Sequence, residues 1–317
     1  MITGRWERAA GRVVLLVLVV VTLVPFVDLF VTALHPPGTY PAGLTWPRDP
    51  HWSNFANAFR QARMAELLTS SALVVLGVVP LTLALAVPAA YALGHLRFTG
   101  HRAVLGLFAV GLVLPLEAIV TPLYQQVRDL GLLDTRWGLV VALVAIHLPF
   151  AVFWLRAHFA GVPPELSDGA RVDGAGPWQV FARVHLPLAR PAMSSLAILL
   201  LVWTWNHFLL AIVLVDDPAR RTAAGALGAF QGRWGTDVPL LCAGALLLIT
   251  PLLVVFALLH RRVSADLARA ASSPLRVVHR SAGSPPEPYR VNVSRKLKMF
   301  ALTLAGRPKL TVERRSN

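Results

Sequence analysis

Residues 163–191 read PPELSDGARVDGAGPWQVFARVHLPLARP, and this stretch is polar in a chain that is otherwise strongly apolar. It separates two long apolar runs, Val140 to Phe159 and Met193 to Val215. Prolines open and close it, and Gly174 stands near its middle. We therefore expect a structured segment that stays outside a membrane and contacts a soluble partner.

The composition places the chain among membrane proteins. Of its 317 residues, 56% are hydrophobic and only 15% are charged, and the mean hydropathy is +0.60. Soluble domains carry about 25% charged residues. The one cysteine, Cys242, lies in an apolar run and is most simply a small buried hydrophobe. No phosphate-binding loop and no metal-ligand spacing is present, so we expect this chain to bind no ATP by itself and to hold no metal or other cofactor.

Apolar runs long enough to span a bilayer predict an all-α membrane protein with six spans, since a span needs about 20 mostly apolar residues. Internal prolines do not exclude these spans, because neighbouring helices can satisfy the freed backbone groups. The first run is too long for a signal peptide and is expected to be retained. The six runs are Val13 to Leu34, Leu67 to Leu93, Ala103 to Tyr124, Leu139 to Phe159, Ala192 to Val215 and Val238 to His260.

Arginines in the short loops favour an orientation with both termini in the cytoplasm, which puts 163–191 on the cytoplasmic side between the fourth and fifth spans. We expect a cytoplasmic N-terminus at 1–12, a six-helix domain at 13–262 and a disordered basic cytoplasmic tail at 263–317. The tail holds 11 basic and 3 acidic residues, which is +8 of the net charge of +14. Such a tail suits an anionic inner leaflet. The other basic residues are scattered at the ends of apolar runs, so nucleic-acid binding is not expected.

Within the polar stretch, the residue types predict two short helices and a turn. Ser167 or Asp168 can accept hydrogen bonds at a helix start, and Gly174, preceded by Asp173, suits a left-handed turn. Small residues at Gly169 and Ala170 would let a partner approach the backbone. Leu186 and Pro187 are expected to end the second helix. A cytoplasmic loop that merely lies on the bilayer is the alternative.

This stretch resembles the signature loop of ABC-importer permeases, in which E-A-A, three residues, Gly and nine further residues precede I-x-L-P. Asp168-Gly169-Ala170, Gly174 and Val184-His185-Leu186-Pro187 stand at those spacings, with Asp for Glu and Gly for the first Ala. The resemblance implies a coupling segment that docks on a separate ATP-hydrolysing subunit. Its residues would be Asp168, Gly169, Ala170, Asp173, Gly174, Leu186 and Pro187.

Polar residues inside the apolar runs mark a candidate substrate pathway, because such groups usually face a bundle interior or a wet cavity. Trp203 to Phe208 resemble the T-W-N-E/D-F element of carbohydrate permeases, with His207 in the acidic place. Glu117 lies in a stretch that resembles P-x-E-x-x-x-x-P-x-Y, where it either bonds a substrate hydroxyl or pins a kinked helix. Packing between helices is the alternative for the residues of Trp203 to Phe208. The candidates are Glu117, Tyr124, Trp205, Asn206 and His207, whereas His95 and His147 are expected to be structural.

Taken along the whole body, these elements resemble the shorter-looped permease of a carbohydrate-type ABC importer, of the maltose and glycerol-phosphate kind, with the type I importer fold. The resemblance implies a bacterial cell membrane, a second homologous permease, two ATPase subunits and an extracytoplasmic substrate-binding protein. It also implies a sugar-like substrate and no enzymatic activity. An importer for peptides, amino acids or phosphate remains an alternative. A secondary transporter or a membrane anchor whose tail recruits a partner is a weaker one.

Overall fold

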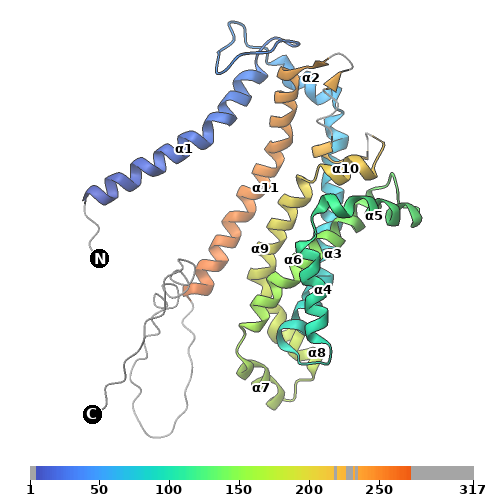
Figure 1. Ribbon diagram of the computed structural model, residues 1–317. Helices are drawn as coiled ribbons and strands as arrows, with labels where there is room; N and C mark the ends of the chain where they lie inside the picture. Colours follow the sequence, from blue (N-terminus) through green and yellow to red (C-terminus); the bar gives the residue numbers. More distant parts are fainter. Residues whose placement is uncertain (1–4, 218–219, 226–230, 233–234, 273–317) are drawn as a thin grey trace, which may run out of the picture. The chain divides into compact units, whose positions relative to one another are not determined.

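The computed structural model describes residues 5–217, 220–225, 231–232 and 235–272, and these are almost entirely helical (Figure 1). A two-residue antiparallel ladder joins β1 to β2. The elements before the polar stretch are α1 (Arg5–Ala33), α2 (Ser53–Gln61), α3 (Met64–His95), α4 (His101–Val113), α5 (Leu116–Asp129) and α6 (Arg136–Ala160). Those that follow are α7 (Pro164–Val172), α8 (Pro177–Val180), the π-helix η1 (Phe181–His185), α9 (Leu186–Trp205), α10 (Leu209–Leu214), β1 (Gln231–Gly232), β2 (Gly235–Thr236) and α11 (Val238–Ser272).

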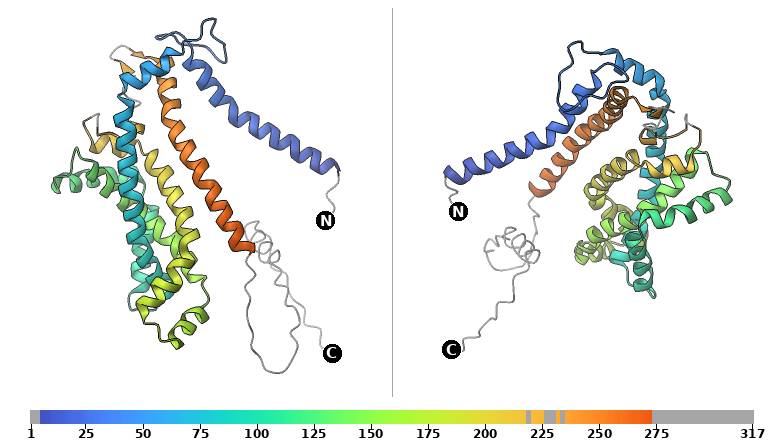
Figure 2. Two further views of the ribbon diagram at one scale, coloured as in Figure 1. Left: turned by 180° about the vertical axis from the view of Figure 1, so that it is seen from behind. Right: turned by 45° about the horizontal axis from the view of Figure 1, so that its top comes forward.

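The described residues contain five helices that are long and apolar enough to cross a membrane, or six if the bent pair α4 and α5 forms one span. This agrees with an all-α membrane protein. The third expected span, Ala103 to Tyr124, is not one straight helix, because α5 turns by 107° from α4 (Figures 1 and 2). Leu114 is extended before Pro115, as expected of a residue whose helical conformation the following proline ring disfavours.

Helices α3 and α6 form the centre of the packed bundle. Small residues let them approach closely, since a Cβ at Gly77 would lie 2.9 Å from Val140 and one at Gly94 would lie 3.0 Å from the Arg156 carbonyl oxygen. Around this pair, one apolar cluster adds α5 and α10, and a second adds η1 and α9. The bundle therefore holds the polar stretch and the fifth span through the same two helices.

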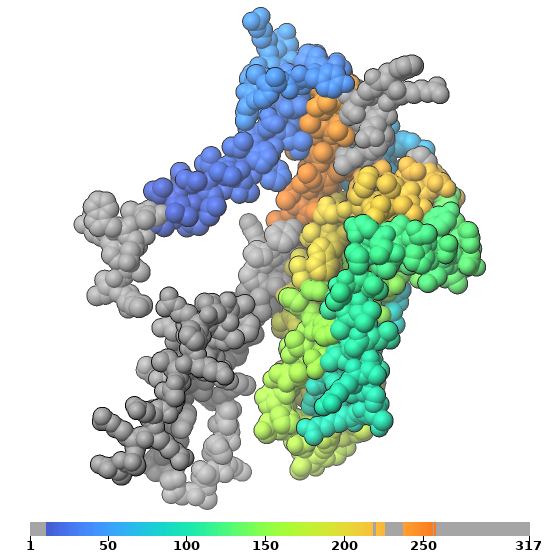
Figure 3. All heavy atoms as spheres, viewed as in Figure 1, coloured from blue at the N-terminus to red at the C-terminus, as the bar shows by residue number. Residues whose placement is uncertain are grey.

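Helix α1 is bound to the rest only near its C-terminal end. Leu29 and Ala33 pack with residues of α2, α3 and α11, whereas none of the 18-residue apolar window of α1 is buried. In Figure 3 the blue helix accordingly stands clear of the bundle except at its C-terminal end, where it meets α11 and α2. An apolar helix with this exposure is suited to contact lipid or another membrane helix.

Two expected helix boundaries fall elsewhere in the structure. The fifth apolar run was expected to reach Val215 as one span, but α9 ends at Trp205 and α10 starts at Leu209. Helix α11 continues to Ser272, beyond the expected start of the basic tail. The rest of the predicted tail, 273–317, lies outside the described residues.

Candidate functional site

The polar stretch folds as one short helix, α7, then a left-handed turn at Gly174, whose φ is +85°, and then a second helix that starts at Pro177. The N–H of Ala175 donates to the Ala170 carbonyl oxygen at 2.9 Å, and that of Gly174 donates to the Arg171 carbonyl oxygen at 3.0 Å. This pair of bonds is the Schellman motif, which satisfies the last carbonyls of a helix. The turn at Gly174 is therefore confirmed, with Asp173 as the C-cap of α7.

The start of α7 differs from the expectation that Ser167 or Asp168 would cap it. Pro164 occupies the first turn and no side chain caps the helix. The hydroxyl of Ser167 instead lies 3.0 Å from Nε2 of His95 and 2.8 Å from Nε2 of His185. Asp168 pairs with Arg171 at 3.1 Å. The expected cap is wrong because the helix begins three residues earlier, at the proline, and Ser167 faces inward.

Ser167, His95 and His185 form what we call the histidine anchor, which ties α7 to the end of α3 and to η1. His185 is fully buried, and the ring of Tyr91 lies 4.9 Å from it, centroid to centroid. Figures 1 and 2 show α7 and α8 together at one end of α3 and α6. Sequence reasoning missed His185 and treated His95 as isolated, because their meeting depends on tertiary packing.

The helix that follows the turn is continuous from Pro177 to Trp205, so the expectation that Leu186-Pro187 would end it is wrong. Pro187 lacks an N–H, and inside a regular α-helix its ring would clash with the preceding turn. Here the π-helix η1 widens that turn, and the N–H of Leu186 donates to the carbonyl oxygen of Phe181, five residues back. The wider turn therefore leaves room for the ring of Pro187, and the helix continues through it.

Much of the surface of α7 and α8 is open and partly apolar. Val172 is 87% exposed and Trp178 is 73% exposed, although both belong to short helices packed on the bundle. A Cβ at Gly169 would meet no atom within 4 Å, and Asp168 is exposed. Exposed large apolar side chains on an otherwise polar segment suit contact with another protein or with the membrane surface.

A second polar region, which we call the α9 break, lies where the fifth span ends. His207 follows Asn206 there, and the ring of His147 from α6 lies 6.5 Å from that of His207 and 5.8 Å from that of Trp203. Three buried atoms have no hydrogen-bond partner among the described residues: Nε2 of His147, Nδ1 of His207 and Oγ1 of Thr204. His147 is only 6% exposed.

The other pathway candidates are spread around this region rather than joined to it. Trp205 donates from Nε1 to the Leu248 carbonyl oxygen of α11 at 3.3 Å, and Asn206 donates back to Val202 at 2.9 Å. Tyr124 packs on the apolar cluster that contains α10. Glu117 is exposed in the first turn of α5, directly after the bend, where a carboxylate is favourable to the helix dipole.

The turn between α5 and α6 fixes the loop that follows α10. Asp134 has a left-handed φ of +55°, and its Oδ1 accepts from the N–H groups of Asp216 and Asp217 at 3.1 and 2.8 Å. Thr135 caps α6 by accepting from the N–H of Gly138. This turn therefore holds a segment that is far away in the chain, which sequence spacing alone could not indicate.

Comparison with known proteins finds a matching family and similar relatives. A family profile described as "Binding-protein-dependent transport system inner membrane component" matches residues 86–269. The trehalose transport system permease protein of Mycobacterium tuberculosis is 33% identical over 84% of this chain and 98% of its own length. The diacetylchitobiose uptake system permease protein of Streptomyces coelicolor is 32% identical over 69% of this chain and 74% of its own length.

Solved structures share the fold at lower identity. A chain of a bacterial ABC transporter involved in the import of the acidic polysaccharide alginate superposes with a TM-score of 0.69 at 21% identity, over 82% of this chain and 99% of that one. A chain of the MetNI methionine ABC transporter in an inward-facing conformation gives a TM-score of 0.53 at 18% identity, over 66% of this chain and 95% of that one. These likenesses support the helical permease fold.

Proposed function

Because this chain belongs to the family of binding-protein-dependent transport inner-membrane components and is a multi-pass ABC-transporter permease, we propose that it imports a sugar or a sugar-like solute. Family membership implies a substrate-binding protein and an ATPase as partners. The proposed assembly contains a second homologous permease and two ATPase subunits, with both termini of this chain in the cytoplasm. ATP hydrolysis would belong to the partner subunit.

The observation that carries the coupling role is the Gly174 turn. It projects α7 from the bundle as an exposed helix whose inner side is bound by the histidine anchor. Asp168, Gly169 and Ala170 lie on this helix, and Leu186 and Pro187 follow in the same continuous helix as α9. In the proposed mechanism a movement of the ATPase displaces α7, and the anchor passes that displacement to α3 and α9.

The α9 break is the proposed contact with solute. A sugar offers hydroxyl groups, which can both donate and accept, and His207 and His147 hold nitrogens that lack partners among the described residues. Trp203 is partly exposed beside His147 and could stack on the apolar face of a sugar ring. Glu117, Tyr124, Trp205 and Asn206 are proposed only as part of the wider pathway.

The sugar is proposed from two relatives, whose names specify trehalose and diacetylchitobiose. Uptake of these two disaccharides into vesicles that contain the full transporter and its binding protein tests the substrate class. We expect transport of at least one disaccharide, or competition by it. Transport of peptides, amino acids or phosphate with no effect of either sugar would favour the alternative importer class.

Substitution of Gly174 tests the coupling role separately. A β-branched side chain is strained at a φ of +85°, so Gly174→Val should distort the turn. We expect uptake to fall by about tenfold or more, the effect of about 1.4 kcal/mol, while the chain still assembles and ATP hydrolysis is uncoupled or lost.

Gly43→Val is the matched control, because Gly43 has a φ of +65° and a Cβ there would also meet nothing within 4 Å. It introduces comparable backbone strain in a loop outside the polar stretch. Equal uptake by both variants would contradict the assignment of 163–191 as the transmission element.

A further inference from the structure

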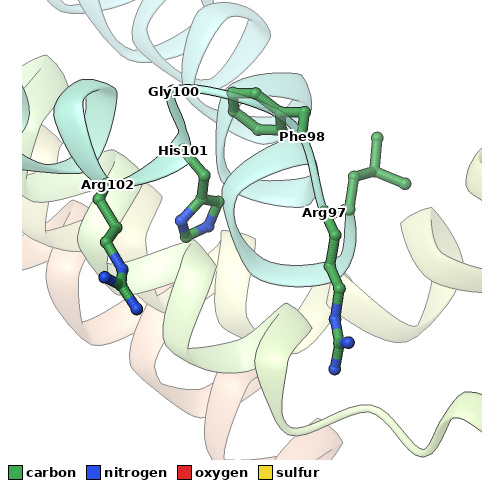
Figure 4. A pocket seen from close by; sticks show the side chains of 6 residues that line it. Arg97, Phe98, Gly100, His101 and Arg102 are labelled. Atoms are coloured by element: carbon green, nitrogen blue, oxygen red, sulfur yellow. The ribbon is translucent and has the colours of Figure 1, made fainter.

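The loop between α3 and α4 and the exposed helix α7 border a hollow of about 560 Å3. Its polar lining comes from separate parts of the chain: His95 at the end of α3, Arg97 in the loop, His101 in α4, Arg156 in α6, and Ser167, Asp168 and Arg171 in α7. A neighbouring hollow of about 400 Å3 shares Arg97 and His101 and adds Arg102. Figure 4 shows Arg97, His101 and Arg102 projecting to the same side of the loop.

Positive charge in these two hollows exceeds negative charge. Four guanidinium groups line them, whereas Asp168 is the one carboxylate and is paired with Arg171. Arg156 donates from Nε to the Leu93 carbonyl oxygen at 3.1 Å, and neither Arg97 nor Arg102 has a carboxylate partner among the described residues. Arginines without a carboxylate partner that line adjoining hollows favour the binding of an anion.

The backbone adds to this preference. Helix α4 begins at the hollow with His101, and its N-cap Gly100 has no side chain to accept hydrogen bonds from the first turn. The first N–H groups of a helix carry partial positive charge and suit phosphate oxygens. The helix start and the arginines therefore favour the same kind of ligand.

We propose that these two adjoining hollows together bind a phosphate-bearing anion, either the headgroup of an anionic lipid or a free phosphate. Guanidinium groups match the geometry of phosphate oxygens and can bind them bidentately. The bound anion joins Arg97 and Arg156, on the bundle, to Arg171 on α7. Its occupancy would restrain α7 and hence the segment proposed to dock on the ATPase.

Hydrogen exchange of the α7 backbone in lipid discs containing the full chain tests the proposal. Discs of phosphatidylglycerol, discs of phosphatidylcholine, and phosphatidylcholine discs with added inorganic phosphate separate the two sources. At a ligand concentration of about twice the dissociation constant, exchange of 166–172 should slow by about threefold. Protection in phosphatidylglycerol alone identifies a lipid headgroup, and protection by inorganic phosphate identifies the free anion.

The double variant Arg97→Gln with Arg102→Gln should abolish this protection, because it removes two of the guanidinium groups proposed to bind the anion. Both side chains are exposed, so the fold should stay intact. Arg183→Gln with Arg190→Gln removes two exposed arginines from η1 and α9 and should retain it. Arg156→Gln provides a second test of the same site from α6. The proposal would be overturned if exchange of 166–172 in phosphatidylglycerol discs, and in phosphatidylcholine discs with inorganic phosphate, were as fast as in phosphatidylcholine discs alone. Equal loss in both double variants would also overturn it, because protection would then follow surface charge.

Discussion

The two ends of α9 treat their polar groups differently. At its start, the hydroxyl of Ser167 lies within hydrogen-bond distance of both His95 and His185, although Nδ1 of His185 and Nε2 of His158 in α6 have no partner among the described residues. At its end, His147, His207 and Thr204 each keep a buried polar atom without such a partner. A buried unpaired group costs about 1–3 kcal/mol. This difference supports the proposal that the first site serves the fold and that the second contacts a solute.

The largest effect on stability is expected at the histidine anchor. His185→Ala removes a fully buried ring and the Ser167 contact that joins α7 to η1, and we expect the free energy of unfolding to fall by about 2–4 kcal/mol. Denaturant or thermal unfolding in detergent measures the loss. His51→Ala, in the loop before α2, is the control and should change stability little. A similar small change in both variants would remove the distinction between the two ends of α9.

An opposite outcome is expected at the α9 break. His147→Leu removes a buried nitrogen that has no partner among the described residues, so the free energy of unfolding should change by less than about 1 kcal/mol or increase. Sugar uptake should nevertheless fall. Thr82→Val also removes a buried unpaired atom, from α3, and should leave uptake unchanged. A large loss of stability in His147→Leu would make that histidine structural, as its sequence context suggested.

The smallest effect on stability is expected at the exposed ion pair of α7. Asp168→Asn should change the free energy of unfolding by less than about 0.5 kcal/mol, because solvent screens such pairs. Asp129→Asn is a close match: the Arg128–Asp129 and Arg171–Asp168 pairs are both 3.1 Å long and similarly exposed. Only Asp168→Asn should weaken stimulation of the ATPase in the assembled transporter. Equal stimulation in both would place Asp168 outside the docking contact.

The sequence alone predicted structural features that depend on one residue or on one continuous apolar run. The apolar runs predicted the spans because length and composition alone make a helix able to cross a bilayer. Gly174 predicted its turn because the left-handed conformation is costly for other residues. Both signals are local, so they survive without knowledge of the rest of the fold.

Sequence was insufficient where backbone direction or distant contacts decide. The bend at Leu114 and Pro115 and the break after Trp205 interrupt runs that hydropathy treats as continuous. The meeting of His147 with His207, and of Ser167 with His185, depends on how α6, α7 and α9 pack. The Pro187 prediction was wrong because a proline ends a regular helix but can be accommodated by a wider turn.

The π-helix Phe181–His185 determines which way the side chains of α9 point around the helix axis. One additional residue in a turn rotates the subsequent side chains by about 100° around the helix axis. Trp203 and Thr204 therefore present the faces they do because this extra residue is present upstream. Deleting a single residue from 181–185 would turn the distant polar end away from His147 and would place Pro187 in a regular helical turn, where its ring clashes.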